Sequence, residues 1–392
     1  MVGCVVALAV LGAACGGGGK SASTTSTTVK YDVAAGVGSP AATLRTQLTD
    51  LLQEHALLVG MAAGAQLSGQ NPAPITAVLD QNSADLGKLV GDLYPAAGAA
   101  FLDQWKRHAA ALIAYSSVAT GDKAAQTAAK AQITDIEKQL TTTLNTANVQ
   151  LTPEALTKTF SDYSGAVLSA ISAQAKKDEA AAAKLKKAAD GMATPAIVLA
   201  AGIVKQKADS YPGKLDGISS DVRATFGAGL QQHVYLTGLV TGLTIAGADA
   251  KAATEALDEN SRQLSRVVAA AYSDEAARRF LQLWRQHVGY VVDFASASAA
   301  NDVSKQDAAR SALADNSDAL AGFFSTADDK LSKEELDQQL GDHVDALLGV
   351  VQAQAAKDPA TMAKLRAAAL ESTDLALYLA TGIAQQNPTK FG

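Results

Sequence analysis

An internal repeat accounts for almost the whole chain after residue 40, and it constrains the fold more than any other feature of the sequence. The segment RTQLTDLLQEHALLVGMAAG (45–64) aligns with RATFGAGLQQHVYLTGLVTG (223–242). Near the end of each copy, LAAGIVKQ (199–206) aligns with LATGIAQQ (379–386), so the spacing between aligned residues barely changes. A repeat of this length indicates two tandem domains rather than a solenoid of short units. We expect the two domains to cover residues 41–210 and 218–392.

Both repeats are predicted to be helical. Ala and Leu are abundant, and such residues lose little conformational freedom in a helix. No run of Val, Ile or Thr with alternating polarity follows residue 30, so no strand is predicted. Prolines mark the expected breaks between helices, as in NPAP (71–74). A helix should begin at Pro153, with Thr152 as its N-cap. In the first repeat the expected helices cover residues 41–68, 73–93, 96–119, 122–147, 153–177 and 179–208.

Long helices joined by short turns pack antiparallel as bundles. The predicted fold class is therefore all-α, with two tandem homologous helical bundles of about six helices each. Gly191 and Pro195 should bend the last helix of the first bundle, because neither residue supports a regular helix interior.

The beginning of the chain has the pattern of an export signal. Residues 2–14 form an apolar stretch that is too short to span a bilayer, and small residues precede Cys15. This pattern resembles a bacterial lipoprotein signal, in which the cysteine after the lipobox is acylated and becomes the new N-terminus. We expect residues 1–15 to be the signal peptide and lipobox, and residues 16–40 to be a flexible tether. The alternative is secretion with a cleaved signal and no lipid.

The expected location is therefore the extracytoplasmic side of the cell membrane, where a lipid such as palmitate on Cys15 would anchor the protein. Gly12 stands where a lipobox usually has Leu. No basic segment precedes the apolar stretch, which indicates that translation begins further upstream.

Charge and cysteine content narrow the function classes. The net charge is −6 with 18% charged residues, so no basic groove for nucleic acid is expected. Cys4 and Cys15 are the only cysteines, and both precede the repeats. A metal site within the repeats must therefore use His, Asp, Glu or Tyr. A protein partner cannot be named from these features.

The five histidines of the chain follow the repeat. Four of them form pairs across it: His55 with His233, and His108 with His287. The fifth, His343, aligns with Tyr163. His343 lies three residues after Leu340 and four before Leu347, and the other histidines have similar apolar neighbours. Because residues three and four apart share one side of a helix, every histidine is predicted to face the interior of its bundle.

Bundle interiors commonly hold metal sites, and a buried imidazole needs partners for both ring nitrogens. Neutral imidazole suits copper, zinc or iron, and a haem held by two histidines is a variant of the same idea. The sequence lacks a convincing general base beside an open site, so an enzyme is not favoured. The predicted metal ligands are His233, His287 and His343 at one site and His55 and His108 at a weaker one, with Tyr163 and Glu54 as further candidate ligands.

A structural interpretation competes with the metal hypothesis. Any one inward histidine can simply be a core residue that is hydrogen-bonded to its neighbours. Trp105 and Trp284 share the inward face and are expected to be core residues. Asn82 and Asn260 lie inside a predicted helix and are expected to face solvent or to bond locally, although a buried partner is the alternative. On this interpretation the chain is a cofactor-free structural or protein-interaction lipoprotein.

Several motifs resemble those of a family of secreted, all-helical bacterial proteins. They are QEHA (53–56), W-x-x-H (105–108), W-x-x-H-x-x-Y-x-x-D (284–293), D-H-x-x-x-L-L (342–348) and the closing GIAQQNPTKFG (382–392). Members of that family often carry the label "copper amine oxidase", although they lack the β-rich fold of that enzyme. The resemblance implies an extracytoplasmic helical protein whose five inward histidines bind copper. Tyr163 departs from the histidine expected at its position, and no tyrosine-derived cofactor that would support amine oxidation is apparent.

Overall fold

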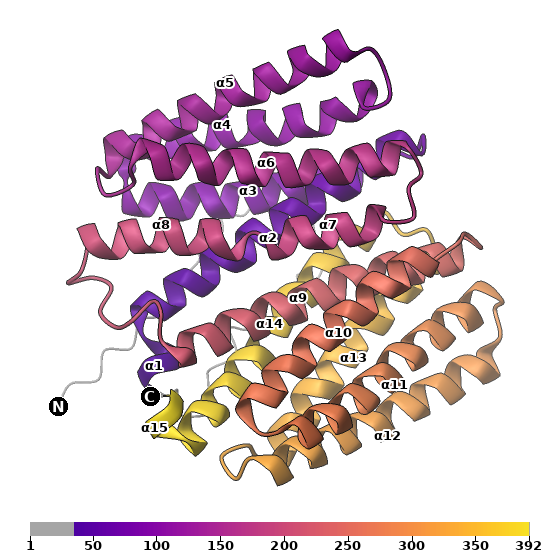
Figure 1. Ribbon diagram of the computed structural model, residues 1–392. Helices are drawn as coiled ribbons and strands as arrows, with labels where there is room; N and C mark the ends of the chain where they lie inside the picture. Colours follow the sequence, from indigo (N-terminus) through magenta and orange to yellow (C-terminus); the bar gives the residue numbers. More distant parts are fainter. Residues whose placement is uncertain (1–34, 392) are drawn as a thin grey trace, which may run out of the picture. The chain divides into compact units, whose positions relative to one another are not determined.

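Helices form nearly all of residues 35–391, the part of the chain that the computed structural model describes, and no strand occurs within that part (Figure 1). The all-α prediction is therefore confirmed. The predicted signal peptide, Cys15 and most of the predicted tether lie outside the described residues. In the first repeat the helices are α1 (Ala35–Gly38), α2 (Pro40–Leu67), α3 (Ala73–Leu93), α4 (Pro95–Ala114), η1 (Tyr115–Val118), α5 (Lys123–Ala147), α6 (Pro153–Ala175), α7 (Ala181–Asp190) and α8 (Ala193–Gln206).

The second repeat follows the same order of helices. It consists of α9 (Ile218–Ile245), α10 (Lys251–Ala271), α11 (Asp274–Ala299), α12 (Val303–Ala327), α13 (Lys333–Ala355), α14 (Thr361–Gln386) and α15 (Pro388–Phe391). Both repeats belong to one compact unit, Val33–Gly392. That each repeat folds as a domain of its own stays a prediction.

The helices begin where the sequence offers caps. Ser39 precedes Pro40, and its hydroxyl accepts a hydrogen bond from the Ala42 amide at 3.2 Å. The predicted cap at Thr152 is confirmed, because its hydroxyl accepts from the Ala155 amide at 3.3 Å. Such caps satisfy amide groups that have no partner within the helix, and so they fix where each helix starts.

Two local features differ from a simple succession of straight helices. The last helix of the first repeat does not merely bend: it breaks at Gly191 and Met192 into α7 and α8, whereas its counterpart α14 is continuous. Pro195 lies in the first turn of α8, where its missing N–H is not needed. At the other end, Ala35–Gly38 of the predicted tether forms helix α1, which packs against α2, α9 and α14.

The stretch Ala181–Gln206 is the one part of the described chain that is long and apolar enough to cross a membrane, with a mean hydropathy of 1.3. It comprises the broken pair α7 and α8. Both of these helices pack against α2 and α6, as helices in the core of a bundle do.

The two repeats contact each other mainly through their first helices, α2 and α9. Arg45 of α2 donates a hydrogen bond to the Leu215 carbonyl, just before α9. Its aligned partner Arg223 of α9 donates to the Val37 carbonyl at 2.6 Å, just before α2. Each first helix thus holds the segment that leads into the first helix of the other repeat. This reciprocal arrangement is the pattern that a two-fold related pair of subunits would give.

A buried carboxylate lies at the same contact. Glu54 of α2 has no exposed surface, and Arg366 of α14 donates to its two oxygens at 3.0 and 3.2 Å. The Tyr235 hydroxyl of α9 donates at 2.6 Å, and the Asn82 amide of α3 donates at 2.7 Å. Four helices from both repeats therefore meet at one carboxylate, whose burial is compensated by charge-assisted hydrogen bonds.

We predict that Arg366→Ala lowers the free energy of unfolding by about 3–5 kcal/mol, because it leaves the Glu54 carboxylate buried without a counter-charge. Lys364→Ala is the matched control on the same helix. Lys364 is about half exposed and pairs with Asp358 at 3.0 Å, so its loss should cost less than about 1 kcal/mol. Urea unfolding of both variants measures the difference. Equal losses would mean that the Glu54–Arg366 pair does not hold the repeats together.

Candidate metal centre

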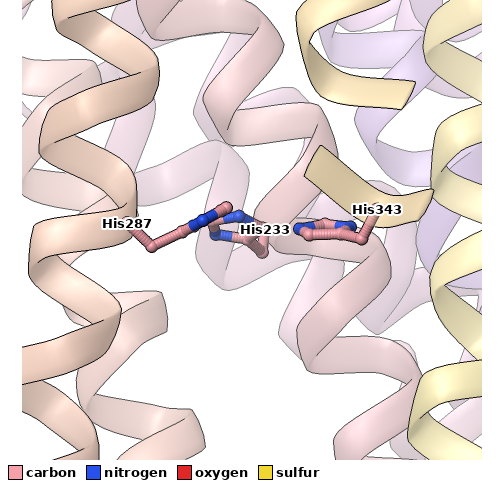
Figure 2. Close-up of side chains that lie close together, drawn as sticks. All are labelled: His233, His287 and His343. Carbon is pink, nitrogen blue, oxygen red and sulfur yellow. The ribbon is translucent and has the colours of Figure 1, made fainter. Parts of the chain in front are cut away.

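Three histidines of the second repeat come together in the bundle interior. His233 lies on α9, His287 on α11 and His343 on α13, and their exposed fractions are 0%, 1% and 3%. Figure 2 shows the three rings at a common height in the space between these helices. The ring centroids lie 5.4 to 5.6 Å apart, and one ring nitrogen from each residue lies within 4.8 Å of the other two. We refer to these residues as the triad.

The ring nitrogens of the triad lack protein partners. Among the described residues, no hydrogen-bond partner is found for five buried nitrogens: Nδ1 and Nε2 of His233, Nε2 of His287, and Nδ1 and Nε2 of His343. A buried polar group left without a partner costs about 1–3 kcal/mol. Core histidines that serve only structure are normally hydrogen-bonded. The triad therefore combines unsatisfied ring nitrogens with a close approach of one nitrogen from each residue.

Burial keeps these imidazoles neutral. Loss of hydration lowers the pKa of His343 to about 4. Loss of hydration and the nearby His343 lower the pKa of His287 to about 3. The pKa of His233 is lowered well below its ordinary value by burial first and then by the two neighbouring histidines. Neutral imidazole is the form that coordinates a metal, so the triad is in its ligating form at neutral pH.

A tryptophan forms one wall of the triad. The Trp284 ring lies 4.8 Å from the His233 ring and 5.1 Å from the His287 ring. Trp284 is buried, as expected for a core residue, and so is its aligned partner Trp105. An apolar wall of this kind excludes water and so strengthens any interaction between the imidazoles and an ion.

The aligned residues of the first repeat also lie together in the core. His55, His108 and Tyr163 are buried, and we refer to them as the first-repeat cluster. The Tyr163 ring lies 6.1 Å from the His55 ring and 5.7 Å from the His108 ring. Unlike the triad, the two histidines have protein partners. His55 Nδ1 lies 3.1 Å from Asn82 Oδ1, and His108 Nε2 lies 3.0 Å from Ser164 Oγ.

Glu54, which the sequence suggested as a further ligand, points elsewhere. Its carboxylate is occupied by Arg366, Tyr235 and Asn82, and it reaches His55 only through the Asn82 amide. The aligned position in the second repeat is Gln232, which accepts a hydrogen bond from Asn260 at 3.1 Å. The Glu54 carboxylate therefore does not contact the first-repeat cluster, and it orients His55 through Asn82.

The expectation that Asn82 and Asn260 face solvent or bond locally is wrong. Both side chains are fully buried, and each donates across to the preceding helix, Asn82 to the Leu51 carbonyl and Asn260 to the Gly229 carbonyl. The partners lie 31 residues away in sequence, so a local pattern could not reveal them. The one available signal was the position of each asparagine three residues after a leucine on the inward face.

Two further residues of the first repeat were missed from the sequence. Glu137 of α5 and Ser164 of α6 are buried, and both approach His108 Nε2, at 3.4 and 3.0 Å. The Ser164 hydroxyl donates to Glu137 Oε1. Both side chains contact the same ring nitrogen of His108. In the catalytic Ser-His-acid arrangement of hydrolases, the acid and the serine contact opposite ring nitrogens. The arrangement orients His108 and does not activate a nucleophile.

We predict that the metal-free protein shows a histidine-dependent loss of stability on acidification. Between pH 6.5 and about 3 an unfolded His287 binds a proton that the folded chain excludes, so lowering the pH favours unfolding. His287→Gln removes this term. The free energy of unfolding of wild type should therefore fall more steeply from pH 6.5 to pH 4.5 than that of the variant, by about 1.4 kcal/mol per pH unit. Urea unfolding with a chelator present measures both slopes, and identical slopes would contradict a buried, neutral His287.

No family model, no curated protein and no solved structure matches the chain. The function therefore has to be argued from the geometry of the site itself.

Proposed function

We propose that this protein binds a transition-metal ion through the triad. The observation that supports this most directly is that three buried imidazoles bring one ring nitrogen each to within 4.8 Å of the other two, while five of their nitrogens have no protein partner among the described residues. A bound ion would offset the cost of burial, because each coordinating lone pair would gain a partner and the imidazoles have already lost their hydration.

The geometry is close to what coordination requires. Zn–N bonds of about 2.1 Å place tetrahedral ligand nitrogens about 3.4 Å apart. The triad nitrogens lie within 4.8 Å of one another, so small rotations of the rings would close the site. Three imidazoles leave a fourth position for water or an exchanging ligand, and all-imidazole sets suit copper, zinc or iron.

An ion fits this site better than haem. The three rings and Trp284 pack with centroids 4.8 to 6.3 Å apart, which leaves no space for a porphyrin between them. No carboxylate belongs to this metal-binding group of described residues. We therefore propose that the imidazoles alone hold the metal.

The proposed setting is the extracytoplasmic face of the cell membrane. Its support is the apolar stretch that ends at Cys15, together with the resemblance to secreted helical proteins labelled for copper. A lipid-anchored metal carrier outside the membrane is consistent with repeats that have no cysteine, because such a site does not depend on thiol redox state.

We predict that copper or zinc raises the melting temperature of residues 29–392 and that His287→Ala abolishes this rise. An ion present at a hundred times its Kd adds about 2.7 kcal/mol of stability. Leu347→Ala is the control, because Leu347 is buried four residues after His343 and ligates nothing. This variant should lose about 2–5 kcal/mol with or without metal but keep the metal-induced rise.

A different outcome would support the cofactor-free interpretation. If His287→Ala lowers the melting temperature equally with and without copper, zinc and iron, and wild type binds none of them, the triad is a structural cluster. A Soret band on addition of haem would overturn the preference for an ion.

We also predict that Cys15 fixes the protein to the membrane. Cys15→Ser should move the full chain from the membrane fraction to the soluble fraction of the producing bacterium, because acylation requires the thiol. Cys4→Ser is the matched control and should leave the distribution unchanged. Retention of the Cys15 variant in the membrane fraction would exclude this anchor.

A further inference from the structure

We infer that the first repeat carries a second metal site with a different ligand set: His55 Nε2, His108 Nδ1 and the Tyr163 phenolic oxygen. This inference rests on the metal-binding function proposed above, but its observations come from other residues. All three atoms are buried, and none has a hydrogen-bond partner among the described residues. They belong to residues that align with the triad, on helices in the same order.

The tautomer of His55 follows from its neighbours. The Asn82 amide nitrogen donates to the Leu51 carbonyl at 2.9 Å and to the Glu54 carboxylate at 2.7 Å. The oxygen of the same amide therefore faces His55 Nδ1, at 3.1 Å. Because an amide oxygen only accepts, Nδ1 must carry the proton. The lone pair of His55 is thus on Nε2, the nitrogen without a partner.

The tautomer of His108 follows in the same way from a different set of residues. The Ser164 hydroxyl gives its single proton to Glu137 Oε1, so its oxygen can only accept from His108. Nε2 of His108 must therefore carry the proton, and Nδ1 holds the lone pair. The two histidines of the cluster have different partners. In both of them the nitrogen that carries the lone pair is the one without a hydrogen-bond partner.

Oriented histidines of this kind are the usual companions of a metal. Ligating imidazoles donate their other N–H to a carboxylate, carbonyl or similar acceptor, which fixes the ring and raises its basicity. Asn82 does this for His55, and Ser164 with Glu137 does it for His108. The triad has no such partners on His233 and His343, so the first repeat contains the more pre-oriented imidazoles.

A surface pocket reaches the two residues that orient His108. This pocket of about 400 Å³ is lined by residues of α5 and α6, Glu137 and Ser164 among them, and by Tyr115 of η1. His108 itself is fully buried behind them. An ion in this pocket first meets the Glu137 carboxylate, on the Nε2 side of His108, so the side chains of Glu137 and Ser164 must move before it reaches Nδ1.

The ligand set selects an ion unlike that of the triad. A phenolate oxygen is a harder ligand than imidazole, and it brings a negative charge into the core, where Tyr163 interacts electrostatically with the Glu137 carboxylate. An oxidised ion such as Fe³⁺ matches this charge better than Zn²⁺. Its bond to a phenolate also gives a visible charge-transfer band, which a site made only of imidazoles does not show.

The test adds Fe³⁺ to the His287→Ala chain, in which the triad is incomplete. One equivalent of bound iron and a visible band are expected. Tyr163→Phe in the same background should remove the band and lower the affinity at least about tenfold. Tyr94→Phe, which changes another buried tyrosine of the same repeat that does not line this pocket, should leave both unchanged.

A second readout separates ligation from folding. Because the Tyr163 hydroxyl has no partner in the described chain, Tyr163→Phe should leave the melting temperature of the metal-free protein unchanged or raise it. Only the rise induced by Fe³⁺ should be lost. Loss of stability without metal, or a band that persists in Tyr163→Phe, would overturn the inference.

The two proposals fail in different ways. If the His287→Ala chain shows no iron and no band while wild type binds copper or zinc, the first-repeat site is wrong and the triad stands. If wild type and His287→Ala bind copper or zinc equally while Tyr163→Phe abolishes the iron band, the triad is wrong and the first-repeat site stands.

Discussion

The buried carboxylate of Glu54 is the interaction on which the arrangement of the two repeats depends. It receives hydrogen bonds from Arg366 and Tyr235 of the second repeat, and it holds the Asn82 amide that orients His55. A carboxylate without exposed surface is tolerated only where such donors surround it. The contact between repeats and the orientation of a histidine in the core are therefore parts of one network, and neither can be changed without the other.

At the equivalent contact of the second repeat, the carboxylate comes from a different residue. Gln232 replaces Glu54, and the carboxylate is supplied by Asp190 of α7 in the first repeat. Asp190 accepts from Gln232 at 2.9 Å and from Lys186, the counterpart of Arg366, at 2.8 Å. Because Asp190 is partly exposed, its carboxylate is more hydrated than that of Glu54. The reciprocal contact has therefore diverged into a buried and a partly hydrated version.

Much of the fold could be predicted from the sequence, because helix periodicity and caps are local. Spacings of three and four placed His343 and the other histidines inside, and Thr152 marked a helix start. The supports of the site could not be predicted in this way. Glu54 was a candidate ligand for the neighbouring histidine, but it turns to Arg366, 312 residues away, and Glu137 meets His108 across a helix–helix contact. Such contacts depend on how each helix is rotated in the bundle, which a one-dimensional pattern does not record.

The triad is difficult to explain by packing alone. An apolar side chain of similar size at His233 or His343 would fill the same space and would remove the cost of its unpartnered nitrogens. The first repeat shows that this fold can give a buried histidine a partner on one ring nitrogen, since Nδ1 of the aligned His55 faces Asn82. The proposed partner of the triad lies outside the protein, and a cation is a partner that three neutral imidazoles at this distance can share.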